Sequence, residues 1–205
     1  MSAFELPFGD GNMAVDLPDC SVTVAEPPGG EAVEVRPAAE AALADPLGPD
    51  LSALADPDDT VAIVVTDITR ATPDGVLVDV LLSELERAGV YREQVTVVVG
   101  LGLHRPMTDA ELEAMLGEHA DLAVNHDPDD TVEVGSVDGT PIELNRTVAR
   151  ADRVLATGMV EPHQYAGFSG GGKTVAIGAG GESLIRYTHG PDMLSDDGVR
   201  LGSID

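Results

Sequence analysis

Short runs of β-branched residues alternate along the chain with stretches of helical periodicity. The runs "TVAIVVT" (60–66) and "QVTVVVG" (94–100) are apolar at almost every position, which is typical of strands buried on both faces of a parallel sheet. The segment "RTVARADRVLATGMV" predicts a short helix followed by a third buried strand near 153–160. Alternation of such strands with helices indicates an α/β fold with a mainly parallel, Rossmann-like sheet flanked by helices.

Polar residues mark where the intervening helices begin. Thr72 and Pro73 supply an N-cap and a first helical position before a run of apolar residues at helical spacing. Thr108 and Glu111 form a capping box for a second helix, "DAELEAMLG". Further along, "DTVEVGSVDGTPIELN" predicts a small hairpin that turns at Asp138–Gly139, since this dipeptide favours tight two-residue turns.

The first 50 residues differ in composition from the rest of the chain. They are rich in proline and glycine, with short strand-like pieces such as "CSVTVAEP" and one predicted helix in "RPAAEAALADPLG". We therefore expect a β-rich N-terminal extension, residues 1–50, on a core of residues 51–205. Together these residues are expected to form a single α/β domain, because 205 residues are enough to bury a core.

The net charge of the chain indicates the salt concentration to which the protein is adapted, and says little about its reaction. Asp and Glu number 37 against 11 Lys and Arg, for a net charge of −26, and the carboxylates are dispersed along the sequence. A dispersed acidic surface with almost no lysine is typical of proteins adapted to concentrated salt. The same balance argues against nucleic acid as a partner, because few cationic groups are present to neutralise phosphates.

The sequence also indicates the compartment of the chain. Cys20 is the only cysteine, so a disulfide framework is excluded. The start "MSAFELPFGDGN" lacks the basic segment and apolar run of a signal peptide, and the apolar stretches are too short to span a membrane. We expect a soluble cytoplasmic protein without a membrane partner.

Ionisable residues follow each of the predicted strands. Asp67 and Arg70 follow the first strand, His104 follows the second and His163 follows the third. Because the carboxyl ends of parallel strands meet at one edge of a sheet, these side chains are expected to converge on a single site.

Two further histidines lie in acidic segments. His119 is part of "GEHAD" and His126 is part of "NHDPDD". We expect both of them on the solvated surface.

The glycine loop "GFSGGGKT" (167–174) contains Lys173, the one lysine of the chain, and matches the phosphate-loop pattern G-x-x-x-x-G-K-[ST]. A phosphate loop needs a strand directly before its first glycine, whereas here six residues intervene. It also needs a helix at the Lys-Thr, whereas "TVAIGAGGE" is rich in glycine and β-branched residues and is a poor helix. Glycines that are costly to order indicate close approach of the backbone to a ligand. A phosphate-loop nucleotide-binding protein stays an alternative.

Three segments resemble the N-terminal domain of lactate racemases: "DPLGPDLSALA…VAIVVTDITRATP", "GLGLHRPMTDAELEAMLG" and "ADRVLATGMVEPHQYAGFSGGGKTVAIGAGGESLIRYTH". The resemblance covers about residues 45–195. Members of that family interconvert D- and L-2-hydroxy acids by reversible hydride transfer to a nickel-pincer nucleotide, a pyridinium mononucleotide with two sulfur-bearing arms. The resemblance implies that this chain is the cofactor-bearing domain, and that the family's C-terminal domain is absent from it. A missing domain or a partner chain is therefore expected.

The resemblance also implies the residues that act on the substrate. His104 and His163 match the two histidines that alternate as acid and base, a role that imidazole can fill near neutral pH. Arg70 matches the arginine that binds the substrate carboxylate, for which the two-pronged guanidinium is suited. Asp67 belongs to the same substrate-binding motif and is expected to orient groups there.

A second set of residues matches the family's cofactor site. Lys173 matches the lysine that carries the nucleotide through a thioamide, and His189 matches the histidine that completes nickel coordination, for which neutral imidazole is suited. The glycine loop would let backbone amides approach the nucleotide phosphate. The other expected cofactor contacts are Thr69, Ser169, Gly170 and Gly171.

Two family motifs are changed in this sequence. The usual "DHTRP" reads "DITRA" from Asp67 to Ala71, and the arginine of the usual "GGRK" is replaced by Gly172. These changes leave the identity of the 2-hydroxy acid open. They also leave open a non-catalytic module that keeps the fold and binds nickel or a small molecule without turnover.

Overall fold

The computed structural model describes residues 3–9, 11–25 and 29–203. Contacts between residues divide the chain into two compact units, Met1–Val33 and Glu34–Asp205. The division falls before residue 50, because helix α1 (Val35–Ala44) packs against helix α3 (Asp74–Arg87) and so belongs to the larger unit.

The smaller unit contains a hairpin, and none of the residues described in it is buried. Strands β1 (Ala3–Phe8) and β2 (Gly11–Asp16) pair in antiparallel fashion. The side chains of Leu6 and Phe8 are 51% and 69% exposed. Residues 20–25 form no strand, so the expected strand in "CSVTVAEP" is wrong there, and its last two residues lie outside the described part of the chain.

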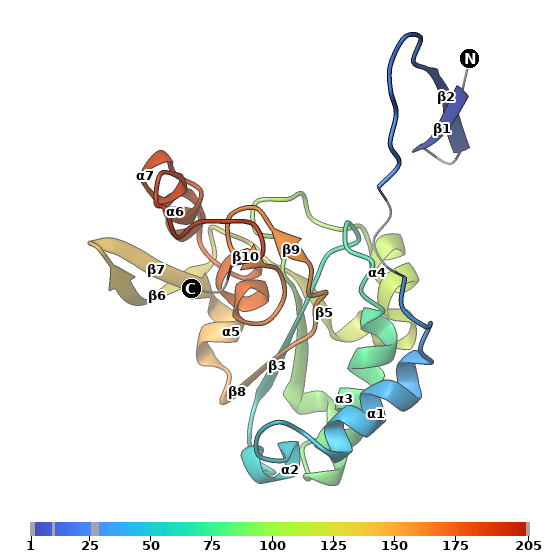
Figure 1. Ribbon diagram of the computed structural model, residues 1–205. Helices are drawn as coiled ribbons and strands as arrows, with labels where there is room; N and C mark the ends of the chain where they lie inside the picture. Colours follow the sequence, from blue (N-terminus) through green and yellow to red (C-terminus); the bar gives the residue numbers. More distant parts are fainter. Residues whose placement is uncertain (1–2, 10, 26–28, 204–205) are drawn as a thin grey trace. The chain divides into compact units, whose positions relative to one another are not determined.

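A four-stranded parallel sheet forms the centre of the larger unit, with strand order β5-β4-β3-β8 (Figure 1). The strands are β3 (Val61–Val65), β4 (Val95–Val99), β5 (Ala123–Asn125) and β8 (Arg153–Ala156). Every residue of β3 is buried, because the strand has a neighbour on each side and both faces of the sheet are covered. The structure confirms the predicted α/β fold with a parallel sheet flanked by helices.

Alternate side chains of the central strands enter two separate cores, as the two-residue period of a strand requires. One core lies between the sheet and helices α3 and α4 (Asp109–Leu116), and it contains Ile63 and Val65. The other lies on the opposite face against α5 (Arg146–Arg150) and contains Ala62 and Val64. The other helices are α2 (Leu51–Leu54), α6 (Glu182–Thr188) and α7 (Pro191–Leu194), with 3-10 turns η1 (Arg92–Gln94) and η2 (Gly117–Leu122).

The third predicted strand lies at an edge of the sheet. The structure places it at β8, where Val154 is 40% exposed and Ala156 is also exposed. The prediction that this strand is buried is wrong, because β8 pairs only with β3 and leaves one face uncovered. Strand β5, at the other edge, was not predicted, since three residues are too few to show a pattern.

The predicted start of helix α3 is one residue too early. Helix α3 begins at Asp74 with Pro73 as its N-cap, while the Thr72 hydroxyl lies 3.0 Å from the Thr66 hydroxyl, within hydrogen-bond distance. The second helix, α4, begins as predicted. The amide of Glu111 donates to the Thr108 hydroxyl, and the amide of Thr108 donates back to the Glu111 carboxylate.

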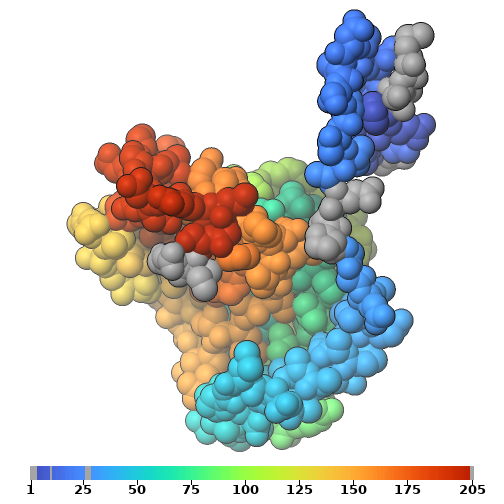
Figure 2. All heavy atoms as spheres, in the orientation of Figure 1, coloured from blue at the N-terminus to red at the C-terminus, as the bar shows by residue number. Residues whose placement is uncertain are grey.

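The predicted hairpin is present in strands β6 (Thr131–Val137) and β7 (Thr140–Asn145). Its turn residues Asp138 and Gly139 have φ values of 48° and 78°, the left-handed conformation that a tight turn requires. Helix α6 packs against β7. Figure 2 shows the C-terminal helices (red) beside this hairpin (yellow) and the segment around the glycine loop (orange). Among the described residues, none of the helices is long and apolar enough to cross a bilayer.

The expectation that His126 lies in solvent is wrong, because only 2% of the residue is exposed. Its Nε2–H donates to the carbonyl of Gly180 at 2.9 Å, and its Nδ1 accepts from the side-chain amide of Asn145 at 3.3 Å. These contacts join the end of β5 to the turn before α6. Burial lowers the pKa of His126, although the hydrogen bond to Gly180 opposes that effect.

We predict that His126 makes the chain sensitive to mild acid. Its pKa is lower in the folded than in the unfolded chain, so the unfolded chain binds the proton first. The stabilisation is therefore complete above the ordinary value of 6.5 and is lost as the pH falls below it. His126→Gln keeps a side-chain amide but does not titrate. Urea unfolding at pH 7.5 and pH 5.5 should show a smaller acid-induced loss of stability in this variant than in the wild type.

The matched control is His126→Ala, which leaves the Gly180 carbonyl and Asn145 without this partner. It should lower the free energy of unfolding at pH 7.5 by roughly 1–3 kcal/mol, the cost of an unpaired buried polar group. Equal acid-induced losses in the wild type and His126→Gln would contradict the assignment.

Candidate active site

A cavity of about 250 Å³ opens at the carboxyl edge of the parallel sheet. Its walls come from the segments that follow β3, β4 and β8, from the glycine loop and from α6. Many of the residues that the sequence indicated line this cavity. They are Asp67, Arg70, His104, His163, Ser169, Gly170, Lys173 and His189. The structure thus brings together side chains that are up to 122 positions apart, from Asp67 to His189.

Two of the expected cofactor contacts do not line the cavity. Thr69 is turned toward Asp67, whose Oδ1 accepts from the Thr69 hydroxyl at 2.5 Å and from its amide at 3.0 Å. Gly171 is exposed, and nothing lies within 4 Å of the position a Cβ would take there. The part of the DITR motif that faces the cavity is therefore Asp67 and Arg70.

The glycine loop folds back on the segment that follows β8. Gly170 has a φ of +78°, and a Cβ on it would lie 3.0 Å from the carbonyl oxygen of Met159. The Ser169 hydroxyl donates to that same carbonyl at 2.7 Å and accepts from the amide of Glu161 at 3.0 Å. The Ser169 hydroxyl therefore joins the glycine loop to the segment that follows β8. A glycine is required at position 170 by both conformation and space.

Lys173 is followed by a single turn of π-helix, η3 (Thr174–Gly178). The prediction of poor helix in this segment is wrong to that extent. This turn packs directly against the end of β4. The two backbones can come this close because Gly100 and Gly178 have no side chains. A Cβ on either glycine would lie 3.1 Å from the Cα of the other, and Gly102 donates its amide to the Gly178 carbonyl at 2.8 Å.

The context of a phosphate loop is missing around the lysine. Strand β8 ends at Ala156, well before Gly167. The intervening segment instead forms a short antiparallel pair, β9 (Pro162–His163) with β10 (Gly167–Phe168). The match to the phosphate-loop pattern therefore does not correspond to a phosphate-loop structure.

Buried Asp67 and exposed His104 form a hydrogen-bonded pair after the ends of β3 and β4. Nδ1 of His104 lies 2.5 Å from Oδ2 of Asp67, which is only 5% exposed. Burial alone would raise the pKa of Asp67, but the hydrogen bonds from Thr69 and His104 outweigh it and hold the pKa below its ordinary value. An ionised Asp67 keeps the His104 proton on Nδ1, so Nε2 of the neutral ring carries the lone pair.

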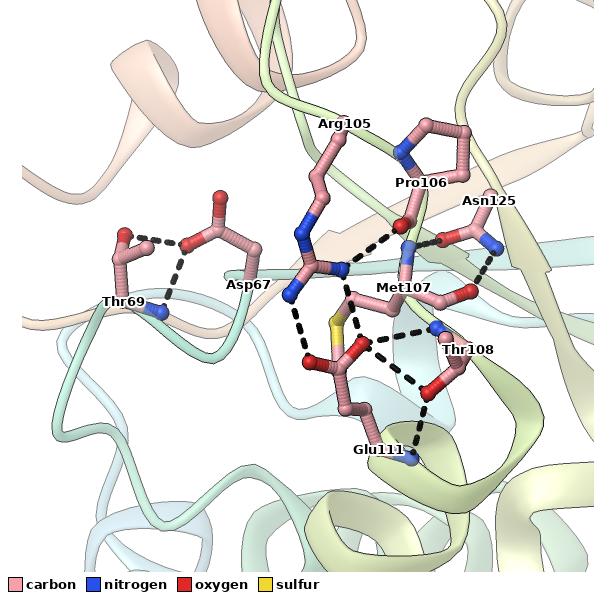
Figure 3. A network of polar contacts seen from close by, with 8 residues as sticks. All are labelled: Asp67, Thr69, Arg105, Pro106, Met107, Thr108, Glu111 and Asn125. Carbon is pink, nitrogen blue, oxygen red and sulfur yellow. Dashed lines mark hydrogen bonds and ion pairs between the residues drawn. The ribbon is translucent and has the colours of Figure 1, made fainter.

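The loop that holds His104 is fastened by contacts outside the cavity (Figure 3). Arg105 makes a two-pronged ion pair with Glu111 at 2.6 and 2.9 Å, which holds the pKa of Glu111 at about 2. The amide and carbonyl of Met107 both bond the side-chain amide of Asn125, at 3.0 and 2.9 Å. Asn125 was not identified from the sequence because it ends the unpredicted strand β5.

Several cationic groups also line the cavity. Lys173 is partly buried, and burial together with the charge of Arg70 lowers its pKa. Burial also lowers the pKa of His163, with further contributions from Lys173, His189 and Arg70. Each of these groups therefore favours the neutral form of its neighbours.

Tyr165 is a further residue that the sequence analysis missed. Its ring stands edge-on to His163 and to His189, with ring centroids 5.8 and 5.5 Å apart. Nδ1 of His189 also lies 2.9 Å from the carbonyl oxygen of Ile185, to which the Nδ1–H donates a hydrogen bond. The lone pair of neutral His189 is therefore on Nε2, the nitrogen available to a ligand in the cavity.

A cluster of possible metal ligands lies elsewhere in the protein. Asp79, Glu118 and His119 have donor atoms within 4.8 Å of one another. His119 is only 7% exposed, so its expected position in solvent is wrong. Its Nε2 contacts Asp79 and its Nδ1 contacts Arg92, and Asp79 also pairs with Arg36. These arginines supply the positive charge that a metal would supply, and the cluster fastens α3 to its neighbours.

The chain matches the family described as lactate racemase N-terminal domain over residues 8–202. The chain belongs to this family. It is 28% identical to the lactate racemase of Thermoanaerobacterium thermosaccharolyticum over 219 positions, which cover 100% of this chain and 51% of that protein. It is 30% identical to the lactate racemase of Lactiplantibacillus plantarum over 173 positions, covering 80% of this chain and 41% of that protein. The chain thus spans about half the length of these relatives.

Solved structures agree with the family assignment. The lactate racemase apoprotein of T. thermosaccharolyticum superposes with a TM-score of 0.80 at 27% identity, over 99% of this chain and 50% of that one. A Thermotoga maritima protein superposes with a TM-score of 0.62 at 23% identity and covers 83% of this chain, which shows a shared fold. The fold of the lactate racemase N-terminal domain is therefore present in this chain.

We predict that Lys173 is unusually reactive for a lysine. Its lowered pKa leaves more free amine near neutral pH, so an amine-reactive reagent should modify it faster than an exposed lysine in a peptide. Arg70→Gln removes one of the two causes, and should raise the pKa and slow the reaction. Because the chain has no other lysine, the mass of the Lys173 peptide reports the reaction directly. Arg105→Gln, outside the cavity, is the control and should leave the rate unchanged.

Proposed function

We propose that the chain is the cofactor-bearing domain of a 2-hydroxy acid racemase. The observation that carries the proposal is the cavity itself, where the chain's one lysine faces a carboxylate-oriented histidine, a second histidine and an arginine. A lysine amine, two imidazoles and a guanidinium are the groups needed to hold a cofactor, handle a hydroxyl proton and bind a carboxylate. Family membership and the two curated lactate racemases support the same assignment.

The donor set of the cavity fits a nickel-pincer nucleotide better than a bare metal ion. Among the described residues, the one group of three possible metal ligands that lie close together is the cluster around Asp79, outside the cavity. The cavity offers His189, whose Nε2 is oriented by the Ile185 carbonyl, and a partly buried lysine. One imidazole suits a metal that brings its other ligands with it. When bound, this group would supply an acceptor for the hydride of the substrate carbon.

The chain's own residues would bind the substrate and move its proton. Arg70 is exposed at the cavity, where its guanidinium could form a two-pronged contact with a carboxylate. His104 and His163 would act on the hydroxyl proton, and Asp67 would orient His104 rather than bind substrate, because both its oxygens already accept hydrogen bonds. We propose that the rest of the site comes from a further domain or a partner chain, since the relatives are about twice as long.

Covalent loading of Lys173 is the first test of this proposal. The chain, co-expressed with the enzymes that build the cofactor, should gain the mass of the nucleotide, and peptide mapping should place the added mass on Lys173. Lys173→Arg keeps the positive charge but removes the primary amine, so it should gain no mass. An unmodified wild-type chain under these conditions would rule out the cofactor assignment.

Activity is the second test. The protein expressed from its complete reading frame and loaded with cofactor should interconvert D- and L-2-hydroxy acids, followed by chiral chromatography. His104→Ala should lower kcat by roughly 10²–10⁴-fold, the usual contribution of an acid–base group. A loaded protein that binds 2-hydroxy acids without racemising them would instead support a non-catalytic binding module.

We also propose that the surface is adapted to a salt-rich cytoplasm, because the net charge is −26 and the carboxylates are dispersed. Salt screens repulsion between them, since the Debye length falls from about 10 Å at 0.1 M to about 3 Å at 1 M. The melting temperature should rise steeply between these KCl concentrations. Betaine of equal osmolality is the control, since it does not screen charge. Equal melting temperatures at both KCl concentrations would contradict this proposal.

A further inference from the structure

The N-terminal hairpin of β1 and β2 separates its apolar from its polar side chains (Figure 1). Residues that pair across the two strands share a face, and successive residues of a strand alternate between faces. The apolar face therefore consists of Phe4, Leu6 and Phe8 from β1, with Met13 and Val15 from β2. The opposite face consists of Glu5, Pro7, Asn12, Ala14 and Asp16. The side-chain amide of Asn12 donates to the Glu5 carboxylate at 3.4 Å, which agrees with their shared face.

The apolar face of the hairpin is open to solvent. It contains two of the three phenylalanines of the chain, yet Leu6, Phe8 and Met13 are 51%, 69% and 45% exposed. A contiguous exposed apolar patch is typical of a binding surface. A two-stranded hairpin is also only marginally stable by itself in water, because nothing packs against its apolar face. The hairpin therefore needs a partner that covers this face.

The segment that follows the hairpin is incomplete in the same way. Val22 and Val24 have the two-residue period of a strand, but they are 38% and 65% exposed, and residues 20–25 form no strand. A strand needs a neighbour for its backbone N–H and C=O groups. The sequence pattern of this segment thus also favours a partner.

The larger unit fills its own cores without the hairpin, because both cores are built from residues that follow position 50. Residues 17–25 and 29–33, which lie between the hairpin and α1, form no helix or strand. A segment from position 17 to position 33 can span at most about 60 Å when it is fully extended. The hairpin can therefore reach a surface outside the larger unit.

We propose that the apolar face of the hairpin docks on an apolar patch of the further domain that completes the site. The match to the lactate racemase apoprotein covers 99% of this chain, and so includes the hairpin, but it covers only 50% of that protein. The second half of such a protein is available to cover the face. A second copy of this chain fits less well, because two chains with a net charge of −26 repel one another. The further domain rests on the proposed function, whereas the apolar face is a property of this chain.

Photo-crosslinking in the protein expressed from its complete reading frame identifies the partner. Benzoylphenylalanine at position 8 keeps an aromatic ring on the apolar face and, when irradiated, forms bonds to whatever covers it. Mass spectrometry should place these crosslinks on peptides that lie outside residues 1–205. The same group at position 12, on the polar face, is the control and should give few of them. Crosslinks that stay within residues 1–205, or that join two copies of the protein, would overturn the proposal.

Two double variants separate loss of docking from loss of the hairpin. Leu6→Thr with Met13→Thr changes one cross-strand pair of the apolar face, and Glu5→Thr with Ala14→Thr changes the neighbouring pair on the polar face. Threonine is favoured in strands, so both variants keep the propensity for the hairpin. Hydrogen exchange of the hairpin amides in the complete protein should become roughly tenfold faster or more in the apolar-face variant, because buried apolar area is lost. It should stay within about twofold of the wild type in the polar-face variant.

The wild-type chain of residues 1–205 should exchange these amides as fast as the apolar-face variant of the complete protein does. Equal exchange rates in the two double variants would contradict the docking. Neither measurement uses the cofactor or follows racemisation. A complete protein that gives the expected crosslinks but does not racemise 2-hydroxy acids would support the docking and contradict the proposed activity. A protein that racemises them without these crosslinks would contradict the docking alone.

Discussion

The parallel register of β3 with its two neighbours determines where the polar groups of the cavity lie. Val65 pairs with Val99 and Val64 pairs with Ala156, so the three strands end side by side. Asp74, at the start of α3, links the ends of two of these strands. Its carboxylate accepts hydrogen bonds from the hydroxyl of Thr66, which follows β3, and from that of Thr157, which follows β8. Burial raises the pKa of Asp74 despite these bonds. The edge is thus built from strand ends joined by one almost fully buried carboxyl group, and the cavity forms directly above it.

The cavity and the rest of the molecule have opposite electrostatic character. The chain has a net charge of −26, yet Lys173 and Arg70 lie close together in the cavity, beside His163 and His189. A distributed negative field repels anions, such as a nucleotide or a 2-hydroxy acid, while the local cations attract them. Concentrated salt screens the long-range repulsion more than the short-range attraction, because the ligand would lie within a few ångströms of the cations. An acidic surface is therefore compatible with an anion-binding site.

The central fold could be predicted because its hydrophobic periodicity is strong. Very short strands and contacts between distant segments could not be predicted. Strands β3 and β4, the α4 capping box and the β6–β7 hairpin follow from local rules that hold without the rest of the fold. Strand β5 has three residues and shows no pattern, so Asn125 was missed with it. His119 and His126 looked exposed because their sequence neighbours are acidic, but tertiary partners bury the two rings. The site residues came mainly from a family resemblance, and local rules could not reveal that Tyr165 stands between two histidines.

Backbone groups, rather than side chains alone, set the chemistry of the cavity. The amides of a turn fix one nitrogen of His163, and the Ile185 carbonyl fixes one nitrogen of His189. Of the three histidines that line the cavity, only His104 is oriented by a carboxylate, that of Asp67. Neutral backbone dipoles orient a ring without favouring its charged form in the same way. The surroundings of each ring, rather than the ring itself, therefore decide which of its nitrogens is left for a ligand in the cavity.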